Sequence, residues 1–178
     1  MKNLIIMVSF VLMILSVGCE DVNSSSDLAE NVKTSECGGF ESGVMTKLPG
    51  GETEDCSQKL IWSYDESSGV LNIINEAVNL NCCGKHDVNI EKTGEDEYEY
   101  IMVDNADNGM RCGCDCLFDF EADIAGVDNS SVKLRVYTDV EEEAEKTLYW
   151  EGTLDLTKKN GTVIVKERTG DWCSEFPN

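Results

Sequence analysis

The sequence predicts an all-β protein, specifically an antiparallel β-sandwich stapled by disulfides. Short runs of alternating apolar and polar residues recur along the chain, and clusters of Gly, Asn or Asp end each run. No long helical period appears, and the chain carries nine cysteines. About eight strands at such short spacing, without intervening helices, favour a sandwich or barrel over β-α-β units.

The first predicted unit is a β-hairpin. Residues 60–64 and 70–74 are strand-like runs, and the polar run 65–69, which ends in Gly69, separates them.

Two further runs alternate with a period of two, which is typical of half-buried strands. Their apolar members are Tyr98, Tyr100, Met102, Val132, Leu134 and Val136. A third run covers residues 112–120, where Phe118 and Phe120 are expected on the face of the cysteines and Leu117 and Asp119 on the other face.

At the C-terminal side, residues 148–156 alternate again, and Lys159-Asn160-Gly161 leads into residues 162–166. The Asn-Gly pair predicts a tight hairpin between these two runs. The acidic stretch 139–145 is expected to be a solvated connection rather than a helical turn.

The charge of the chain excludes one class of partner. Thirty-five acidic against 14 basic side chains give a formal net charge of -21. Such a surface repels phosphate backbones, so we expect no nucleic-acid partner. Because 41% of the residues are hydrophobic, a buried core is feasible.

The N-terminus predicts export. Lys2 precedes a fourteen-residue apolar run, residues 4–17, which is shorter than the roughly 20 residues that span a bilayer as a helix. Ser16-Val17-Gly18-Cys19 resembles the lipobox of bacterial lipoproteins. This resemblance implies that residues 1–18 are a signal peptide, that Cys19 is lipidated, and that the protein is anchored in the bacterial envelope, facing the periplasm or the exterior. In the alternative, an ordinary secreted protein, Cys19 joins a disulfide.

The remaining chain divides into two parts. Residues 19–36 are rich in Ser, Asn and acids, and predict a flexible tether behind the lipidated cysteine. Residues 37–178 predict a single cysteine-rich β domain.

Cysteines other than Cys19 are expected to form disulfides, because an exported chain meets an oxidising compartment. They are Cys37, Cys56, Cys82, Cys83, Cys112, Cys114, Cys116 and Cys173. The sequence suggests a bridge between Cys37 and Cys56. It also suggests that Cys82 and Cys83 bridge to two of the 112, 114 and 116 set, and that the remaining member bridges to Cys173.

A thiolate metal site is the alternative. Cys82, Cys83 and His86, together with Cys112, Cys114 and Cys116, offer ligands for Zn(II) or Cu(I), although their spacing departs from that of structural zinc sites. Thiol redox chemistry is a third interpretation, disfavoured because Cys-X-X-Cys is absent from the sequence. His86, the single histidine, is expected to be a solvated turn residue.

The segment 103–109 suggests low-affinity calcium binding. Asp104, Asp107, Asn108 and Asp115 are the candidate ligands, although Ala106 occupies a position where an EF-hand needs an oxygen. An Asx-rich turn between two strands explains the segment more simply.

No catalytic motif is present, so we expect a non-enzyme without cofactor. The cysteine pattern of residues 81–83 and 112–120 resembles uncharacterised cysteine-rich bacterial surface lipoproteins, a resemblance that implies no activity. The sequence thus predicts a membrane-anchored binding or structural module whose partner is a protein or a glycan, with thiolate metal binding as the alternative function.

Overall fold

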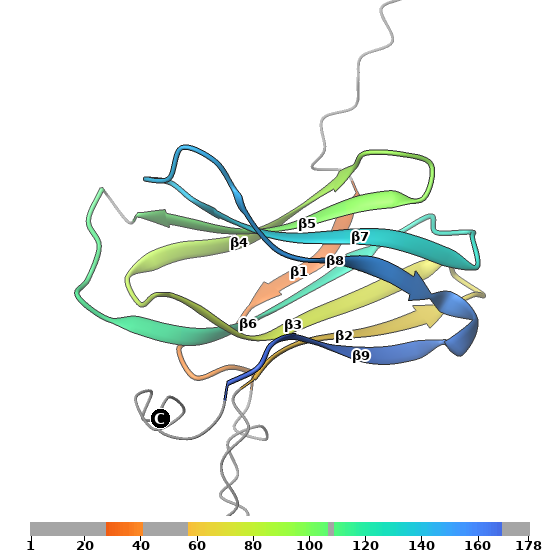
Figure 1. Cartoon of the computed structure of the whole chain (residues 1–178), viewed down its shortest axis with the longest axis horizontal. Helices are drawn as coiled ribbons and strands as arrows, with labels where there is room; N and C mark the ends of the chain where they lie inside the picture. Colours follow the sequence, from red (N-terminus) through yellow and green to blue (C-terminus); the bar gives the residue numbers. More distant parts are fainter. Residues whose placement is uncertain (1–27, 41–56, 107–108, 169–178) are drawn as a thin grey trace, which may run out of the picture.

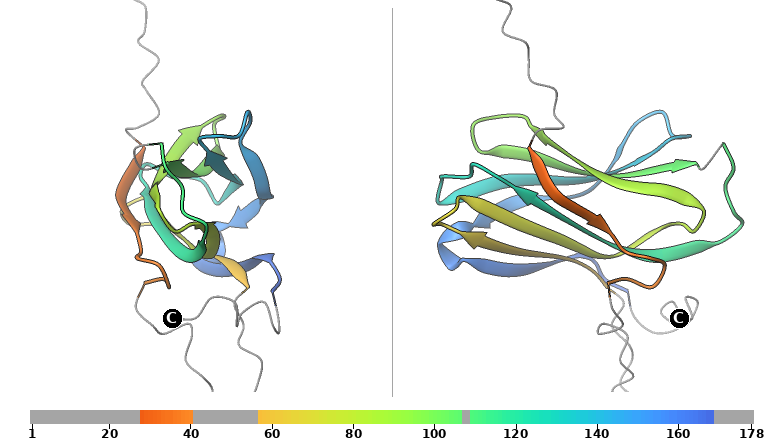
Figure 2. Two further views of the ribbon diagram at one scale, coloured as in Figure 1. Left: turned by 90° about the vertical axis from the view of Figure 1, so that its left-hand side faces the viewer. Right: turned by 180° about the vertical axis from the view of Figure 1, so that it is seen from behind.

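A computed structural model describes residues 28–40, 57–106 and 109–168 of the chain. Within these ranges the fold consists of nine β-strands and one short 3₁₀ helix, arranged as two sheets that face each other (Figures 1 and 2). No helix in the described ranges has the length and apolar character needed to cross a bilayer. The predicted β-sandwich is therefore confirmed.

Sheet A contains five strands in the order β1-β6-β3-β2-β9. Every neighbouring pair in it is antiparallel. Its strands are β1 (Ala29–Thr34), β2 (Gln58–Asp65), β3 (Val70–Asn81), β6 (Asp115–Ile124) and β9 (Asn160–Lys166).

Sheet B contains four strands in the order β4-β5-β7-β8. Its strands are β4 (Gly84–Lys92), β5 (Glu97–Ala106), β7 (Ser131–Val140) and β8 (Thr147–Asp155). The pair β5 and β7 is parallel, whereas the other pairs are antiparallel. After β5 the chain crosses to sheet A and forms β6, and it then crosses back to sheet B and forms β7. The chain reverses its direction twice on this path, so β7 runs parallel to β5.

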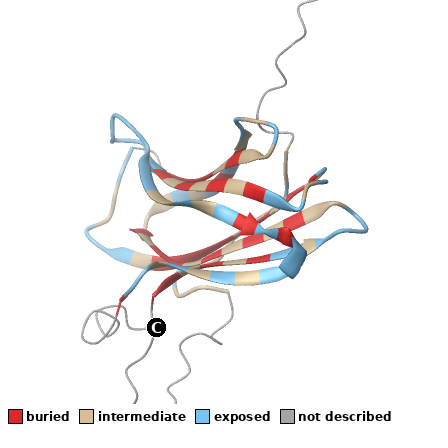
Figure 3. Cartoon of the chain, turned by 45° about the vertical axis from the view of Figure 1, so that its right-hand side comes forward, coloured by how far each residue is buried: buried red, intermediate tan, exposed pale blue. Residues whose placement is uncertain are grey.

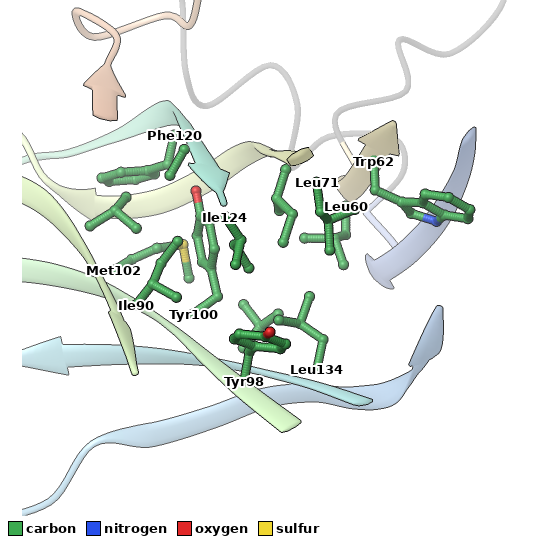
Figure 4. Packing of buried hydrophobic residues seen from close by; sticks show 14 of the residues in the cluster. Leu60, Trp62, Leu71, Ile90, Tyr98, Tyr100, Met102, Phe120, Ile124 and Leu134 are labelled. Atoms are coloured by element: carbon green, nitrogen blue, oxygen red, sulfur yellow. The ribbon is translucent and has the colours of Figure 1, made fainter. Parts of the chain in front are cut away.

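The core fills the space between the sheets, and Figure 3 shows buried residues along strands of both sheets. Tyr98 and Tyr100 extend from β5 into this layer, and Tyr100 reaches towards Phe120 of sheet A (Figure 4). The predicted apolar members of the central runs are all buried. The predicted alternation is confirmed in β7, whereas in β5 it stops at Tyr100, because Ile101 on the other face is buried too. The predicted hairpin is also found: β2 pairs with β3, with Asp65 opposite Val70. Strand β4 was not among the predicted runs, since the residues of its outer face are polar.

Strand β1 corrects the predicted tether. Residues 29–34 were expected to be flexible, but they form an edge strand whose Ala29 pairs with Ile124. The strand has a weak apolar pattern of its own; it depends on backbone bonds to β6 and on Leu28, Ala29 and Val32, which pack against the core. The β domain therefore begins before residue 37.

The predicted Asn-Gly hairpin is wrong. Strand β8 belongs to sheet B and β9 to sheet A, so the chain changes sheets instead of folding back on itself. The 3₁₀ helix η2 (Leu156–Lys158) makes this turn, and Lys159 has a left-handed φ of 63°. Gly161 lies within β9, where a Cβ atom would come within 2.7 Å of the Trp62 indole nitrogen. The absence of a side chain at Gly161 therefore allows Trp62 to pack against β9, and the glycine does not form a turn.

Candidate functional site

One end of the sandwich is closed by three disulfides. They join Cys37 to Cys116, Cys82 to Cys114 and Cys83 to Cys112, with Cα–Cα distances of 5.5, 5.8 and 5.4 Å. Asn81 pairs with Asp115 in the β3–β6 ladder, which places all three bridges at the same end of sheet A. The predicted disulfides are thus found among the described cysteines.

The expected bridge between Cys37 and Cys56 is wrong, because Cys37 bonds to Cys116. Cys116 is therefore not available for the expected bridge to Cys173. The reason is the path of residues 35–40, which follow β6 after β1 ends: the Gly38 amide donates to the Leu117 carbonyl at 2.9 Å. Cys56 and Cys173 lie outside the described residues.

Cys82 and Cys83 form the corner at which the chain leaves β3 in sheet A and enters β4 in sheet B. Their bridges to two members of the 112, 114 and 116 set are as expected. Cys112 and Cys114 precede β6, on the connection that carries the chain from β5 back to sheet A. The two bridges therefore tie two crossings between the sheets to each other.

The sulfur atoms of Cys82, Cys83 and Cys112 lie within 4.8 Å of one another, and no other described residues form a potential metal-ligand group of this kind. His86 is not part of this group, and Cys116 is bonded to Cys37. Of the six ligands suggested by the sequence, the structure thus collects the four cysteines of two adjacent disulfides.

His86 is not the solvated turn residue that was expected. It lies on β4, its side chain is 6% exposed, and its ring centroid is 4.2 Å from that of Phe118. Its Nε2 atom is 3.3 Å from Oδ1 of Asp104, the residue opposite it on β5. Since the ring is covered, it is poorly placed to exchange protons with a substrate in solution.

Asp104 is a buried carboxylate that lies between His86 and Arg111. Arg111 Nη1 is 2.9 Å from its Oδ2 atom, and Nη2 donates to its backbone carbonyl. Arg111 also pairs with Glu142 at 2.6 Å, on the exposed turn that follows β7. Burial by itself raises the pKa of Asp104, but the nearby His86 ring and the hydrogen bonding and charge of Arg111 outweigh it, so the pKa lies below its ordinary value.

The calcium candidates do not converge in the described part of the chain. Asp104 faces His86 and Arg111, and Asp115 begins strand β6 as an exposed residue. Neither belongs to a close group of three ligands among the described residues. Asp107 and Asn108 lie outside the described residues.

The opposite end of the sandwich carries a cleft of about 320 Å³, a size suited to a small ligand. Three loops build it: the β2–β3 turn, the β6–β7 loop and the η2 connection between β8 and β9. Figure 1 shows the ends of these strands together, away from the corner between β3 and β4. The lining residues are Tyr64, Glu66, Asp128, Asn129, Ser130, Leu156, Thr157 and Lys159.

Hydrogen bonds fix the three loops to one another. The Tyr64 amide donates to the Lys159 carbonyl at 2.8 Å, and the Tyr64 hydroxyl donates to the Val127 carbonyl at 2.8 Å. The Leu156 amide donates to the Ser130 carbonyl, also at 2.8 Å. Each loop is thus bonded to another, so the cleft exists without a ligand.

Internal bonds make two of these loops rigid. Asp65 accepts hydrogen bonds from the Ser67 amide and from the hydroxyls of Ser67 and Ser68. Asp155 accepts from the amide and hydroxyl of Thr157 and so caps η2. Both carboxylates consequently have pKa values below their ordinary range, chiefly because the hydroxyls donate to them.

Sequence reasoning missed the cleft. The polar run 65–69 was predicted as a turn, but no local pattern shows that it meets residues 128–130 and 156–159 at one end of the sheet pair. No protein-family model, curated protein or solved structure matches the chain.

Proposed function

We propose that this chain is a binding module of the bacterial cell envelope, anchored through lipid on Cys19, and that its ligand occupies the cleft at the loop end of the sandwich. The lipobox-like residues 16–19 support the anchor. Three described disulfides support residence in an oxidising compartment.

The preformed cleft is the observation that carries this proposal. Cross-loop hydrogen bonds hold its walls, so a ligand would not have to bear the entropic cost of ordering three loops. A purely structural role would not need a preformed cavity there. We infer no catalytic role, since His86 is covered and faces Asp104.

The anchor is tested by expression of the full chain in a bacterial host. We expect the wild type in the membrane fraction with a mass increase from acyl chains, and the Cys19→Ser variant in the soluble fraction with neither. Equal fractionation and unmodified mass of both proteins would refute the anchor.

Binding is tested by nuclear magnetic resonance on the ¹⁵N-labelled full chain in detergent. The probes are neutral disaccharides, glycylglycine, inorganic phosphate and calcium chloride. Saturable shifts confined to the cleft amides, lost in Ser130→Trp and kept in Asn89→Trp on the exposed face of β4, would support the proposal. If no probe shifts these amides, the module is structural.

Thiolate metal binding is a second candidate function, favoured by the three sulfur atoms within 4.8 Å. It requires prior reduction of the Cys82–Cys114 and Cys83–Cys112 bridges, since thiolates are the ligands. Anaerobic reduction with a phosphine, followed by Zn(II) addition and elemental analysis, tests it. One bound Zn(II) that disappears in Cys83→Ser but persists in Cys37→Ser would support the site, and an absence of uptake would end it.

A further inference from the structure

We propose that the ligand of the cleft is a neutral, polyhydroxylated molecule, that is, a glycan. This inference rests on the proposed binding function and specifies its ligand class. It follows from the hydrogen-bonding groups that line the cleft, their charges and the apolar part of the lining.

The lining offers acceptors and donors side by side. Glu66 and Asp128 are ionised carboxylates, which accept hydrogen bonds only, whereas Lys159 donates only. The hydroxyls of Ser130 and Thr157 can do both. A ligand that satisfies all of these groups needs several donors and acceptors close together, and each sugar hydroxyl provides one donor and two acceptor sites.

Some of this capacity is already used within the protein. The Asn129 amide nitrogen donates to Asp96, and the Thr157 hydroxyl donates to Asp155. Thr157 lines the cleft with Lys159, and its hydroxyl keeps lone pairs that can accept hydrogen bonds. Part of the hydrogen-bonding capacity of the lining is thus fixed by the fold.

The charges argue against an anionic ligand. An anion would meet Glu66 and Asp128 in a cleft where Lys159 is the one cation among the described lining residues. It would also have to approach a chain of formal net charge -21. A neutral ligand with many hydroxyls avoids this repulsion. A cation would be attracted by the two carboxylates, and the calcium probe tests that outcome.

The remaining lining is apolar. Leu156 is only 2% exposed, so Tyr64 offers most of the apolar contact; its hydroxyl is held by Val127, which fixes the position of the ring. A sugar ring carries C–H groups on its faces in addition to the hydroxyls at its edge. The cleft therefore pairs an apolar contact with a polar rim, as the two kinds of surface on a sugar require.

The test compares probes on the full chain in detergent, with cleft amide shifts as the readout. We expect N,N′-diacetylchitobiose, maltose or cellobiose to give saturable shifts whose dissociation constant changes less than twofold between 50 and 500 mM NaCl, because salt screens interactions between charges and these ligands carry none. Asp128→Asn, which replaces an acceptor by a group that also donates, should weaken binding about tenfold. Asp139→Asn on β7, outside the cleft, is the matched control and should leave affinity unchanged.

The outcomes separate the two proposals. Shifts caused by glycylglycine, phosphate or calcium but not by any of the disaccharides would overturn the glycan inference and leave the binding function standing. Disaccharide binding that Asp128→Asn does not weaken, or that falls steeply with salt, would also overturn the inference. If no probe shifts the cleft amides, both the glycan inference and the binding function are refuted.

Discussion

His86 and Asp104 face each other across the β4–β5 ladder, with His86 Nε2 3.3 Å from Asp104 Oδ1, inside the sandwich and beside the disulfide-bonded corner. Arg111 reaches the second carboxylate oxygen from the connection between β5 and β6. Asp104 therefore links sheet B to the segment that carries the cysteines, and its removal would leave Glu142 as the remaining carboxylate partner of Arg111.

Asp104→Asn should lower the free energy of unfolding by about 3 kcal/mol, the lower end of the range for breaking a buried pair, because Arg111 keeps Glu142 as a partner. Urea denaturation at pH 7 measures the change. Asp139→Asn, an exposed position on β7, should change it by less than about 0.5 kcal/mol. Similar losses in the two variants would contradict a special role for Asp104.

The contribution of Asp104 should depend on pH. Its pKa in the folded protein lies below the ordinary value of 3.8, so folding favours the ionised form. The resulting stabilisation is fully present above pH 3.8 and is lost as the pH falls through the lower folded-state value. Denaturation curves at pH 7, 5, 4 and 3 should show the gap between wild type and Asp104→Asn closing at the acid end. A constant gap would sink this prediction.

Gly84 allows the pair to form. A Cβ atom at this position would contact Asp104 Oδ1 and come within 2.8 Å of His86 Nε2. Gly84→Ala should therefore destabilise the fold by about 2 kcal/mol, as overpacking of a filled site does. Gly113→Ala is the control, because nothing lies within 4 Å of its Cβ position. Thermal unfolding of both variants checks this, and equal melting temperatures would refute it.

The two adjacent disulfides should act non-additively. While one remains, the other closes a loop of only a few residues, so loss of either pair of cysteines should cost about 2 kcal/mol in the chain-entropy model. Loss of both also frees the whole loop between the two segments and should cost about 5.5 kcal/mol, more than the sum of the two single losses. Serine variants of Cys82 with Cys114, of Cys83 with Cys112, and of all four cysteines test this by urea denaturation. Strictly additive losses would contradict it.

Tyr100 carries a buried hydroxyl without a hydrogen bond among the described residues. Tyr100→Phe should consequently raise the free energy of unfolding by about 1 kcal/mol, since an unsatisfied polar group is removed. Burial raises the pKa of Tyr100 above its ordinary value of 10.0, so the folded protein keeps the hydroxyl neutral where the unfolded chain ionises it. The free energy of unfolding of the wild type therefore falls as the pH rises above 10. The variant should thus resist alkaline unfolding better than the wild type, whereas half-buried Tyr137→Phe should not. Equal alkaline midpoints would argue against this.

Sequence reasoning recovered the elements whose own residues encode them. The period-two alternation around Leu134 was found in the structure because the two faces of β7 have distinct environments. Strand β1 was not predicted from the sequence, because an edge strand with few apolar residues depends on the strand to which it is hydrogen-bonded. His86 was misplaced for a related reason: neighbours in sequence are polar, but its neighbours in space are Phe118 and Asp104.

Composition and local pattern were sufficient to predict the all-β class, the presence of disulfides and the first hairpin, since these depend on residue type and on spacing over a few positions. The tertiary structure decided three features: the pairing of the cysteines, the turn at Lys159 rather than Asn160, and the cleft that three loops enclose. All three depend on how the two sheets pack face to face. Such contacts join residues that are far apart in the chain. Hydrophobic burial drives the packing roughly in proportion to the apolar area removed from water, and no local sequence pattern specifies which residues will meet.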